Sequence, residues 1–254
     1  MTETALDPKA PPATPPPTTP AASKGLLSRA FGIVLSPKAT YAAIVARPRV
    51  LGAMLLVIFI SCAGTFALLS TEVGQNAALD QQIQQRESFG QPPLTDAQYA
   101  QMERFLPYFK YIGVASVAFS LVLIFLVCAG LLFAVFNAIL GGDATFKQVL
   151  ALVVHSGFVF SVSTFFSLPL NYARESLTSA TNLSVFVPFL EETSFVSRFL
   201  GALDLFFIWW ILNLAIGLGV LYKRRTGPIG VGLFMVYVVI ALVIASVRVM
   251  LSGA

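Results

Sequence analysis

Charged residues are scarce in this chain. Only 11% of its 254 residues are Asp, Glu, Lys or Arg, whereas a soluble domain carries roughly a quarter. Hydrophobic residues make up 57% of the chain, and its mean hydropathy is +0.81. These values exclude an ordinary soluble domain and predict an integral membrane protein.

Cysteine and histidine are also scarce, which leaves little material for a metal or redox centre. The chain has two cysteines, Cys62 and Cys128, each inside an apolar run, and one histidine, His155. It contains no CxxC pair, no HExxH zinc motif and no glycine-rich phosphate loop. We therefore expect no catalytic residues, no bound cofactor, no metal site and no enzymatic activity.

Basic residues give a formal net charge of +4, but they lie at the ends of apolar runs and are not interleaved with stacking aromatics. This pattern is typical of a membrane surface and not of a nucleic-acid interface. The expected partner is the lipid bilayer, with anionic headgroups at the cytoplasmic face and no nucleic acid. For a protein partner, another membrane protein and a second copy of this chain are the alternatives.

Five long apolar runs predict an all-α bundle of five transmembrane helices, because a crossing helix needs about 20 apolar residues. The expected spans are at about residues 51–70, 112–140, 147–170, 199–222 and 229–249. Pro169 lies where the third span can end, since proline is tolerated at helix ends. Together with the segments that precede and connect them, these spans form a membrane domain over residues 24–250.

Two different segments precede the first span. Residues 1–23 are rich in proline, threonine and alanine and cannot bury enough apolar surface to fold, so we expect a disordered cytoplasmic tail. Residues 24–49 place apolar side chains at helical spacing among bases, and Ser36–Pro37 begins a second short helix. This pattern predicts amphipathic helices in the headgroup layer.

Charge also predicts the orientation of the chain. Residues 71–111 and 171–198 hold most of the acids, and residues 71–111 are expected to form a helical outer loop. The bases at the other ends of the spans form a predicted cytoplasmic surface. Its members are Lys24, Arg29, Lys38, Arg47, Arg49, Lys223, Arg224 and Arg225. The chain is thus expected in the bacterial cytoplasmic (inner) membrane, with its N-terminus in the cytoplasm and its C-terminus outside.

A few polar residues lie within the predicted spans, where burial in lipid is costly. They are Asn137, His155, Asp204, Asn213 and Arg248. His155 and Asn213 lie at similar depth and are within reach of a hydrogen bond, and Asp204 and Arg248 are within reach of an ion pair. Two interpretations stay open: these groups fasten helices together, or they line a path for a ligand or ion.

The run "ALDLFFIWWILNLAIGLGV", with its acid, aromatic pair, tryptophan and glycine-containing end, resembles the fourth span of bacterial members of the Yip (Ypt/Rab-interacting protein) family. "SPKATYAAIVARP", "LTDAQYAQMERF" and "GGDATFKQVLALVVHSGF" agree with the family in order. The resemblance covers about residues 25–250. It implies five membrane helices and a cytoplasmic N-terminus. Eukaryotic relatives are linked to Rab-type GTPases, but their "DLYGP"-type segment is absent here.

The resemblance and the residues together favour a non-enzymatic membrane scaffold or an organising, trafficking-like factor. The alternative is a small transporter or channel with a polar path through the bundle.

Overall fold

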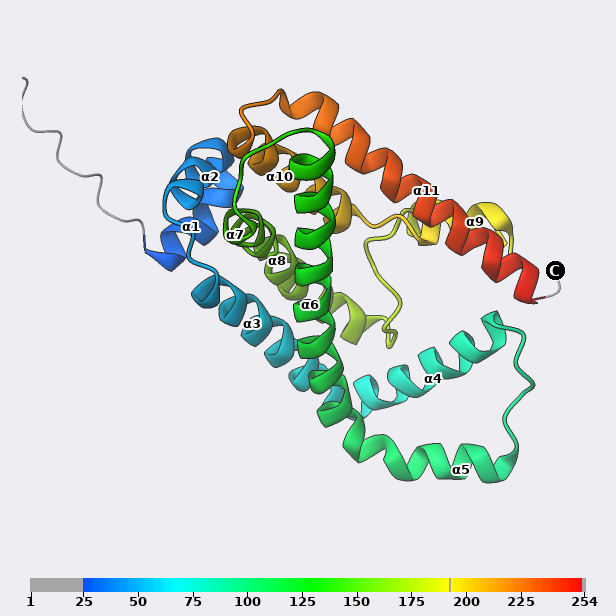
Figure 1. The fold of residues 1–254 in the computed structure, drawn as a ribbon. Helices are drawn as coiled ribbons and strands as arrows, with labels where there is room; N and C mark the ends of the chain where they lie inside the picture. Colours follow the sequence, from blue (N-terminus) through cyan, green and yellow to red (C-terminus); the bar gives the residue numbers. More distant parts are fainter. Residues whose placement is uncertain (1–24, 192, 253–254) are drawn as a thin grey trace, which may run out of the picture.

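The computed structural model describes residues 25–191 and 193–252, and these residues form an all-helical molecule without a strand (Figure 1). An isolated antiparallel bridge pairs Asn182 with Asp204. The all-α fold class predicted from the apolar runs is confirmed. The predicted tail, residues 1–23, and Lys24 lie outside the described residues.

The described helices follow one another closely along the chain. In order they are α1 (Leu26–Leu35), α2 (Pro37–Ala46), α3 (Leu51–Leu69), α4 (Glu72–Ser88), α5 (Asp96–Phe105), α6 (Phe109–Phe133), α7 (Phe146–Ser156), α8 (Phe158–Ala173), α9 (Phe195–Gly201), α10 (Leu205–Leu221) and α11 (Thr226–Ser252). Two 3-10 turns (Leu106–Tyr108 and Leu183–Phe186) and a π-helical segment (Ala134–Ile139) lie between them.

Local sequence explains several helix starts. Pro37 occupies the first turn of α2, where its missing N–H costs nothing, although Ser36 makes no side-chain capping bond. Thr71 caps α4, and Thr95 forms a capping box with Gln98 at the start of α5. The helical loop expected over residues 71–111 is therefore present as the pair α4 and α5.

The third expected span is divided at Gly157, where α7 ends and α8 begins. A Cβ at Gly157 would lie 2.6 Å from the Phe125 ring of α6, so only glycine permits this close approach. The helix does not end at Pro169. Pro169 lies inside α8, which continues to Ala173, because membrane helices tolerate an interior proline at the loss of one backbone hydrogen bond.

The fourth expected span, residues 199–222, is not one helix. Helix α9 ends at Gly201, and α10 begins only at Leu205 and has 17 residues. At about 1.5 Å per residue α10 is roughly 26 Å long, close to the shortest length that crosses a bilayer.

Four stretches of the described residues are long and apolar enough to cross a membrane, by length and composition. They are Leu51–Leu69, Asp96–Ile139, Phe146–Ala173 and Thr226–Leu251. The predicted count of five spans therefore depends on α10.

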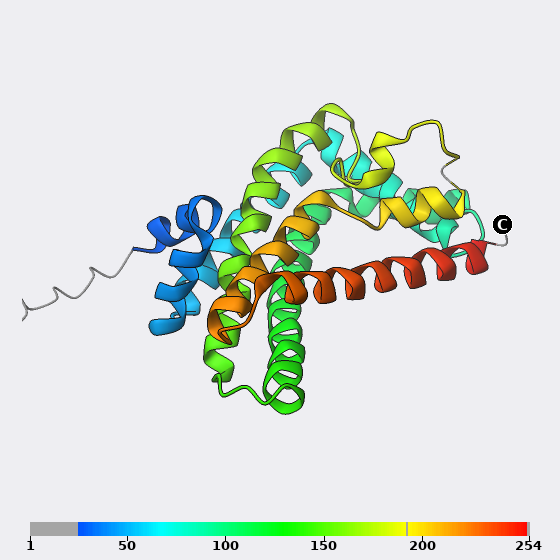
Figure 2. The same cartoon turned by 90° about the horizontal axis from the view of Figure 1, so that it is seen from above.

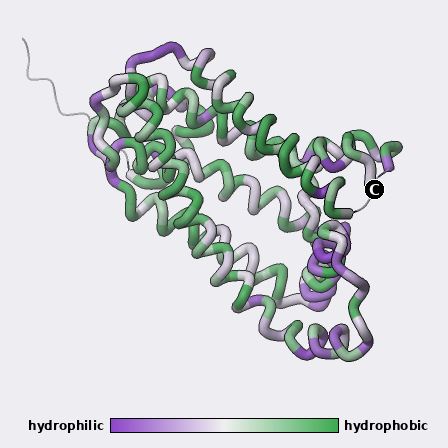
Figure 3. The backbone as a smooth tube through the Cα atoms, turned by 45° about the vertical axis from the view of Figure 1, so that its right-hand side comes forward, coloured by the Kyte–Doolittle hydropathy of each residue, from purple (hydrophilic) through white to green (hydrophobic). Residues whose placement is uncertain are grey.

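The two ends of the bundle differ in chemistry. The end that we call the α1–α2 side holds α1, α2 and the loops at residues 140–145 and 222–225. The opposite end, the hairpin side, holds α4, α5, the loop at 174–191 and the last turn of α11 (Figures 1 and 2). Figure 3 shows hydrophobic helices between these ends and hydrophilic residues gathered on the hairpin side and at the loops.

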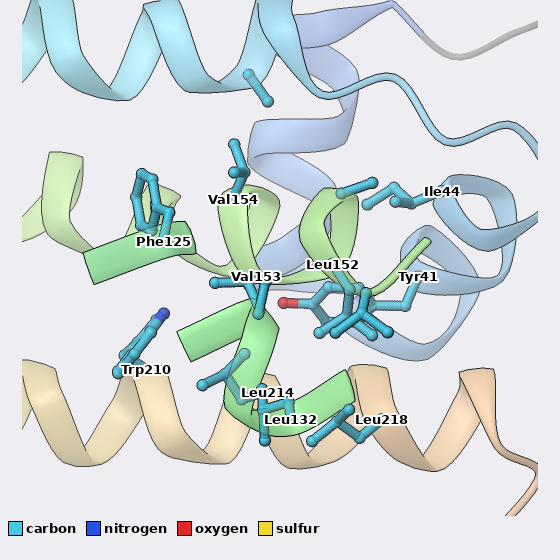
Figure 4. Close-up of a cluster of buried hydrophobic side chains, with 14 of the residues drawn as sticks. Tyr41, Ile44, Phe125, Leu132, Leu152, Val153, Val154, Trp210, Leu214 and Leu218 are labelled. Atoms are coloured by element: carbon cyan, nitrogen blue, oxygen red, sulfur yellow. The ribbon is translucent and has the colours of Figure 1, made fainter. Parts of the chain in front are cut away.

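Helix α7 lies at the centre of the core, between α2, α6 and α10. Figure 4 shows apolar side chains from these four helices converging around Leu152 and Val153, both fully buried. Tyr41 of α2 points its ring into the same cluster and is also fully buried. The short N-terminal helix α2 is thus part of the bundle core, which fixes the α1–α2 side to the spans.

Candidate functional site

Asp204 organises the hairpin-side end of α10. Its Oδ1 accepts hydrogen bonds from the backbone N–H groups of Phe206 (2.8 Å) and Phe207 (3.2 Å), so the carboxylate caps the helix. Its Oδ2 accepts hydrogen bonds from the hydroxyls of Ser179 and Thr181, both at 2.6 Å. One carboxylate therefore holds the start of α10 against the loop that follows α8.

The backbone around Asp204 reinforces this attachment. Leu183 N donates to Leu203 O, and Leu205 N donates to Thr181 O. The Tyr237 hydroxyl of α11 accepts from Asp204 N and donates to Ala202 O, both at 2.9 Å. Three segments far apart in the sequence are thus bound together at one point.

The ion pair expected between Asp204 and Arg248 is not formed. Hydroxyl and amide donors already occupy both carboxylate oxygens of Asp204. The backbone carbonyl of Arg248 instead accepts a hydrogen bond from the Arg198 guanidinium of α9. Arg248 thus lies beside Arg198 and forms no ion pair with an acid of the described residues.

A second polar contact joins α7 to α10 within the core. The indole Nε1 of Trp210 donates to Ser156 Oγ at 2.8 Å, and Ser156 Oγ in turn donates to Val153 O at 2.7 Å. Trp210 and Ser156 are both buried. A buried indole needs a hydrogen-bond acceptor, and Ser156 supplies it across the helix interface.

The hydrogen bond expected between His155 and Asn213 is not formed. His155 Nδ1 is 2.7 Å from Ala151 O, and Asn213 Nδ2 donates to Trp209 O at 3.1 Å. Each side chain thus bonds to the backbone of its own helix. His155 Nε2 and Asn213 Oδ1 are buried without a hydrogen-bond partner among the described residues.

Asn137 joins the two loops of the α1–α2 side. Its Nδ2 donates to Ala144 O, and its Oδ1 accepts from the Tyr222 hydroxyl at 2.7 Å. Arg224 Nη2 also donates to Leu140 O at 2.9 Å. The α6–α7 and α10–α11 loops are consequently held together next to the start of α11.

The bases of the predicted cytoplasmic surface that lie in the described residues are exposed, except for Arg29. The side chains of Lys38, Arg47, Arg49, Lys223, Arg224 and Arg225 are exposed. Arg29 is only 3% exposed because it is on the face of α1 that packs on the bundle. The pKa of the Arg29 guanidinium is lowered, mainly by burial and to a smaller extent by the positive charge of Arg49.

Sequence reasoning missed the partners of the polar residues. Ser179, Thr181 and Tyr237 surround Asp204. Ser156 accepts the hydrogen bond of Trp210, and Tyr222 donates one to Asn137. The run of Ser, Thr and Asn at 176–184 is the one local signal for the Asp204 partners. The others are single residues whose roles depend on tertiary packing.

These features define a class: a multi-pass, all-helical membrane protein in which a few polar side chains join separate segments within the bundle and at its ends. Comparison with protein families gives the particular family. The model of the Yip1 domain matches residues 31–247, so the chain belongs to the Yip1 domain family. No curated protein and no solved structure matches the chain.

Proposed function

We propose that this chain is a non-enzymatic membrane scaffold. Its α1–α2 side would rest on anionic headgroups and present a basic surface to a membrane-protein partner or to a second copy of the chain. The proposal includes five crossings, with the α1–α2 side in the cytoplasm of a bacterial cell and the C-terminus outside.

The observation that carries the proposal is the exposed face of α1. Leu27, Phe31 and Leu35 follow one another at helical spacing and are 65%, 68% and 78% exposed. The exposed bases Lys38 and Arg49 lie on the neighbouring segment. An apolar stripe beside cations is the pattern with which a surface helix enters the interface of an anionic bilayer.

Charge supports the cytoplasmic assignment of this side. Lys147 is exposed on this side as well. The described loops of this side, residues 140–145 and 222–225, contain a single acid, Asp143. Cytoplasmic loops are rich in Lys and Arg. The geometry supports the fifth crossing, because α10 runs from the hairpin side back to the α1–α2 side, where α11 begins (Figure 2).

The scaffold interpretation is also favoured by how the intramembrane polar groups are used. Asp204, Asn137 and Trp210 each hold two segments together. The transporter alternative is favoured by one observation, the unpartnered buried atoms of His155 and Asn213. Two cavities on the hairpin side have neither residue in their linings.

Headgroup docking can be tested on the full chain in nanodiscs. A fluorophore at Phe31→Cys should be quenched by brominated lipid, and quenching should weaken with salt or with Arg47→Gln/Arg49→Gln, because cations hold the helix at an anionic surface. The control is a fluorophore at Gln91→Cys in the exposed loop between α4 and α5, and both variants have Cys62 and Cys128 replaced by alanine so that one site is labelled. Quenching at residue 31 no stronger than at residue 91 would refute docking.

The partner surface needs a separate experiment. Crosslinking in native membranes should capture a partner with the wild-type chain and lose it with Arg47→Gln/Arg49→Gln. The charge-matched variant Arg104→Gln/Lys110→Gln on the hairpin side should retain it. Capture that is unaffected by the first variant would contradict the assigned surface.

A further inference from the structure

The hairpin side contains two neighbouring cavities of opposite chemistry. One, of about 670 Å³, lies between α4, the loop at 174–190, α9 and the end of α11. The other, of about 730 Å³, lies between α4, α5 and the adjoining ends of α3 and α6. Both volumes are within the range of small-molecule sites. The two cavities meet at α4, where Gln81 lines both, and together form one composite site.

The first cavity is polar and basic. Arg174, Arg198 and Arg248 line it together with hydroxyl and amide side chains, and no carboxylate is among its described lining residues. Arg198 is held in place by its bond to Arg248 O. The side chains of Arg174 and Arg248 form no ion pair with the described residues. Guanidinium groups are suited to bind phosphate through paired hydrogen bonds.

The second cavity is mainly apolar. Leu69, Met102, Phe105, Ile112 and Val117 contribute to its lining. Leu69 and Ile112 belong to the hairpin-side ends of α3 and α6, where these spans leave the apolar part of the molecule. This is the level at which lipid headgroups meet acyl chains.

Helix α4 forms the wall between the cavities. Gln84, Gln85 and Ser88 line the polar cavity, whereas Ala78, Gln82 and Arg86 line the apolar one. The latter three recur every four residues and share a helix face.

Gln81 lines both cavities, and its Nε2 donates to Leu177 O at 3.4 Å, which joins α4 to the 174–190 loop at the boundary between the cavities. A ligand that fills both cavities therefore has a charged end and an apolar end that meet near Gln81. Arg86 Nε, buried without a partner among the described residues, adds a donor on the apolar side of the wall.

We propose that the hairpin side binds a phospholipid of net negative charge. Its phosphate lies in the polar cavity with Arg174 and Arg248, and an acyl chain lies in the apolar cavity between α4, α5 and α6. This site is on the opposite side of the molecule from the basic surface of α1 and α2 and does not depend on the scaffold function.

The test uses the full chain, purified in an uncharged detergent, with phosphatidylglycerol, phosphatidylcholine and glycerol 3-phosphate as probes. Native mass spectrometry measures bound lipid, and thermal unfolding measures stabilisation by each probe. Phosphatidylglycerol should bind most tightly and raise the unfolding midpoint most. Glycerol 3-phosphate should have a smaller effect, because it lacks the acyl chain.

Two variants separate the headgroup from the chain. Arg174→Gln/Arg248→Gln should weaken phosphatidylglycerol roughly tenfold or more, because charge-assisted bonds are lost. Its charge-matched control, Arg104→Gln/Lys110→Gln, should not. Ser116→Trp fills the apolar cavity. In this variant phosphatidylglycerol should bind no more tightly than glycerol 3-phosphate and should raise the unfolding midpoint no more.

Three results would overturn the proposal. Equal binding of phosphatidylglycerol and phosphatidylcholine would remove the charge selectivity. Unchanged binding by the double arginine variant would remove the assigned headgroup site. Equal effects of glycerol 3-phosphate and phosphatidylglycerol, with no effect of the tryptophan, would identify a soluble phosphate and not a lipid as the ligand.

Discussion

Replacement of Asp204 by leucine tests the clearest polar contact in the bundle. Leucine removes the cap on the first turn of α10 and the acceptor for Ser179 and Thr181. Losing a helix cap costs about 1 kcal/mol, and each hydrogen bond between segments of a membrane protein contributes roughly 0.6 to 1.7 kcal/mol. The free energy of unfolding should therefore fall by about 3 kcal/mol.

The matched variants sharpen this prediction. Asp204→Asn keeps a good capping side chain and one acceptor oxygen, so its loss should be less than half as large. Glu103→Leu removes an exposed acid of α5 and should change the free energy by under about 0.5 kcal/mol. The assay is reversible unfolding in mixed micelles with increasing SDS, followed by circular dichroism. Abundance in the membrane should follow the same order.

One outcome would contradict this role of Asp204. If Asp204→Leu were as stable and as abundant as the wild type, the carboxylate would not hold the start of α10. The same residue would then become a candidate for a ligand or ion path.

Two further pairs of substitutions probe the interface between α7 and α10. Trp210→Phe should lower the unfolding free energy by about 1–2 kcal/mol, because the indole bond to the α7 serine is lost. Trp209→Phe should cost under about 0.5 kcal/mol, because its indole makes no hydrogen bond with the described residues. Gly217→Ala should cost about 1–3 kcal/mol, since its Cβ would lie 2.7 Å from Leu152. A Cβ at Gly130 would have no neighbouring atom within 4 Å. Gly130→Ala should therefore leave the unfolding free energy unchanged or raise it by up to about 1 kcal/mol. The same unfolding assay compares each pair, and equal losses within a pair would contradict the packing described.

Much of the fold follows from local sequence. The first span is predicted at 51–70 and the helix is Leu51–Leu69, because a long apolar run between Arg49 and Glu72 leaves little choice. The helices of the 71–111 loop follow from their threonine caps. The breaks at Gly157 and at residues 202–204 were missed, because both lie inside continuous apolar runs and depend on what packs there.

The polar contacts were harder to predict. Sequence identified Asp204, His155 and Asn213 as unusual, because each is polar within an apolar run. The sequence predicts that His155 bonds to Asn213 and that Asp204 pairs with Arg248, because depth along an ideal helix is the one guide that a sequence offers. In the structure, Ser179 and Thr181 bind Asp204 from a loop whose path no local pattern specifies. Arg29 is predicted on the surface because it is charged, whereas the face of α1 that packs on the bundle is set by tertiary contacts.

The central claim is that the chain crosses the membrane five times, with the short α10 as the fourth crossing. A reporter that is active only outside the cytoplasm, fused in turn after residues 92, 143, 190, 224 and 252, tests it directly. Five crossings with a cytoplasmic N-terminus require activity after 92, 190 and 252 and none after 143 and 224. Fusions after 224 and 252 that report the same side, or a C-terminus on the side of the N-terminus, would contradict it.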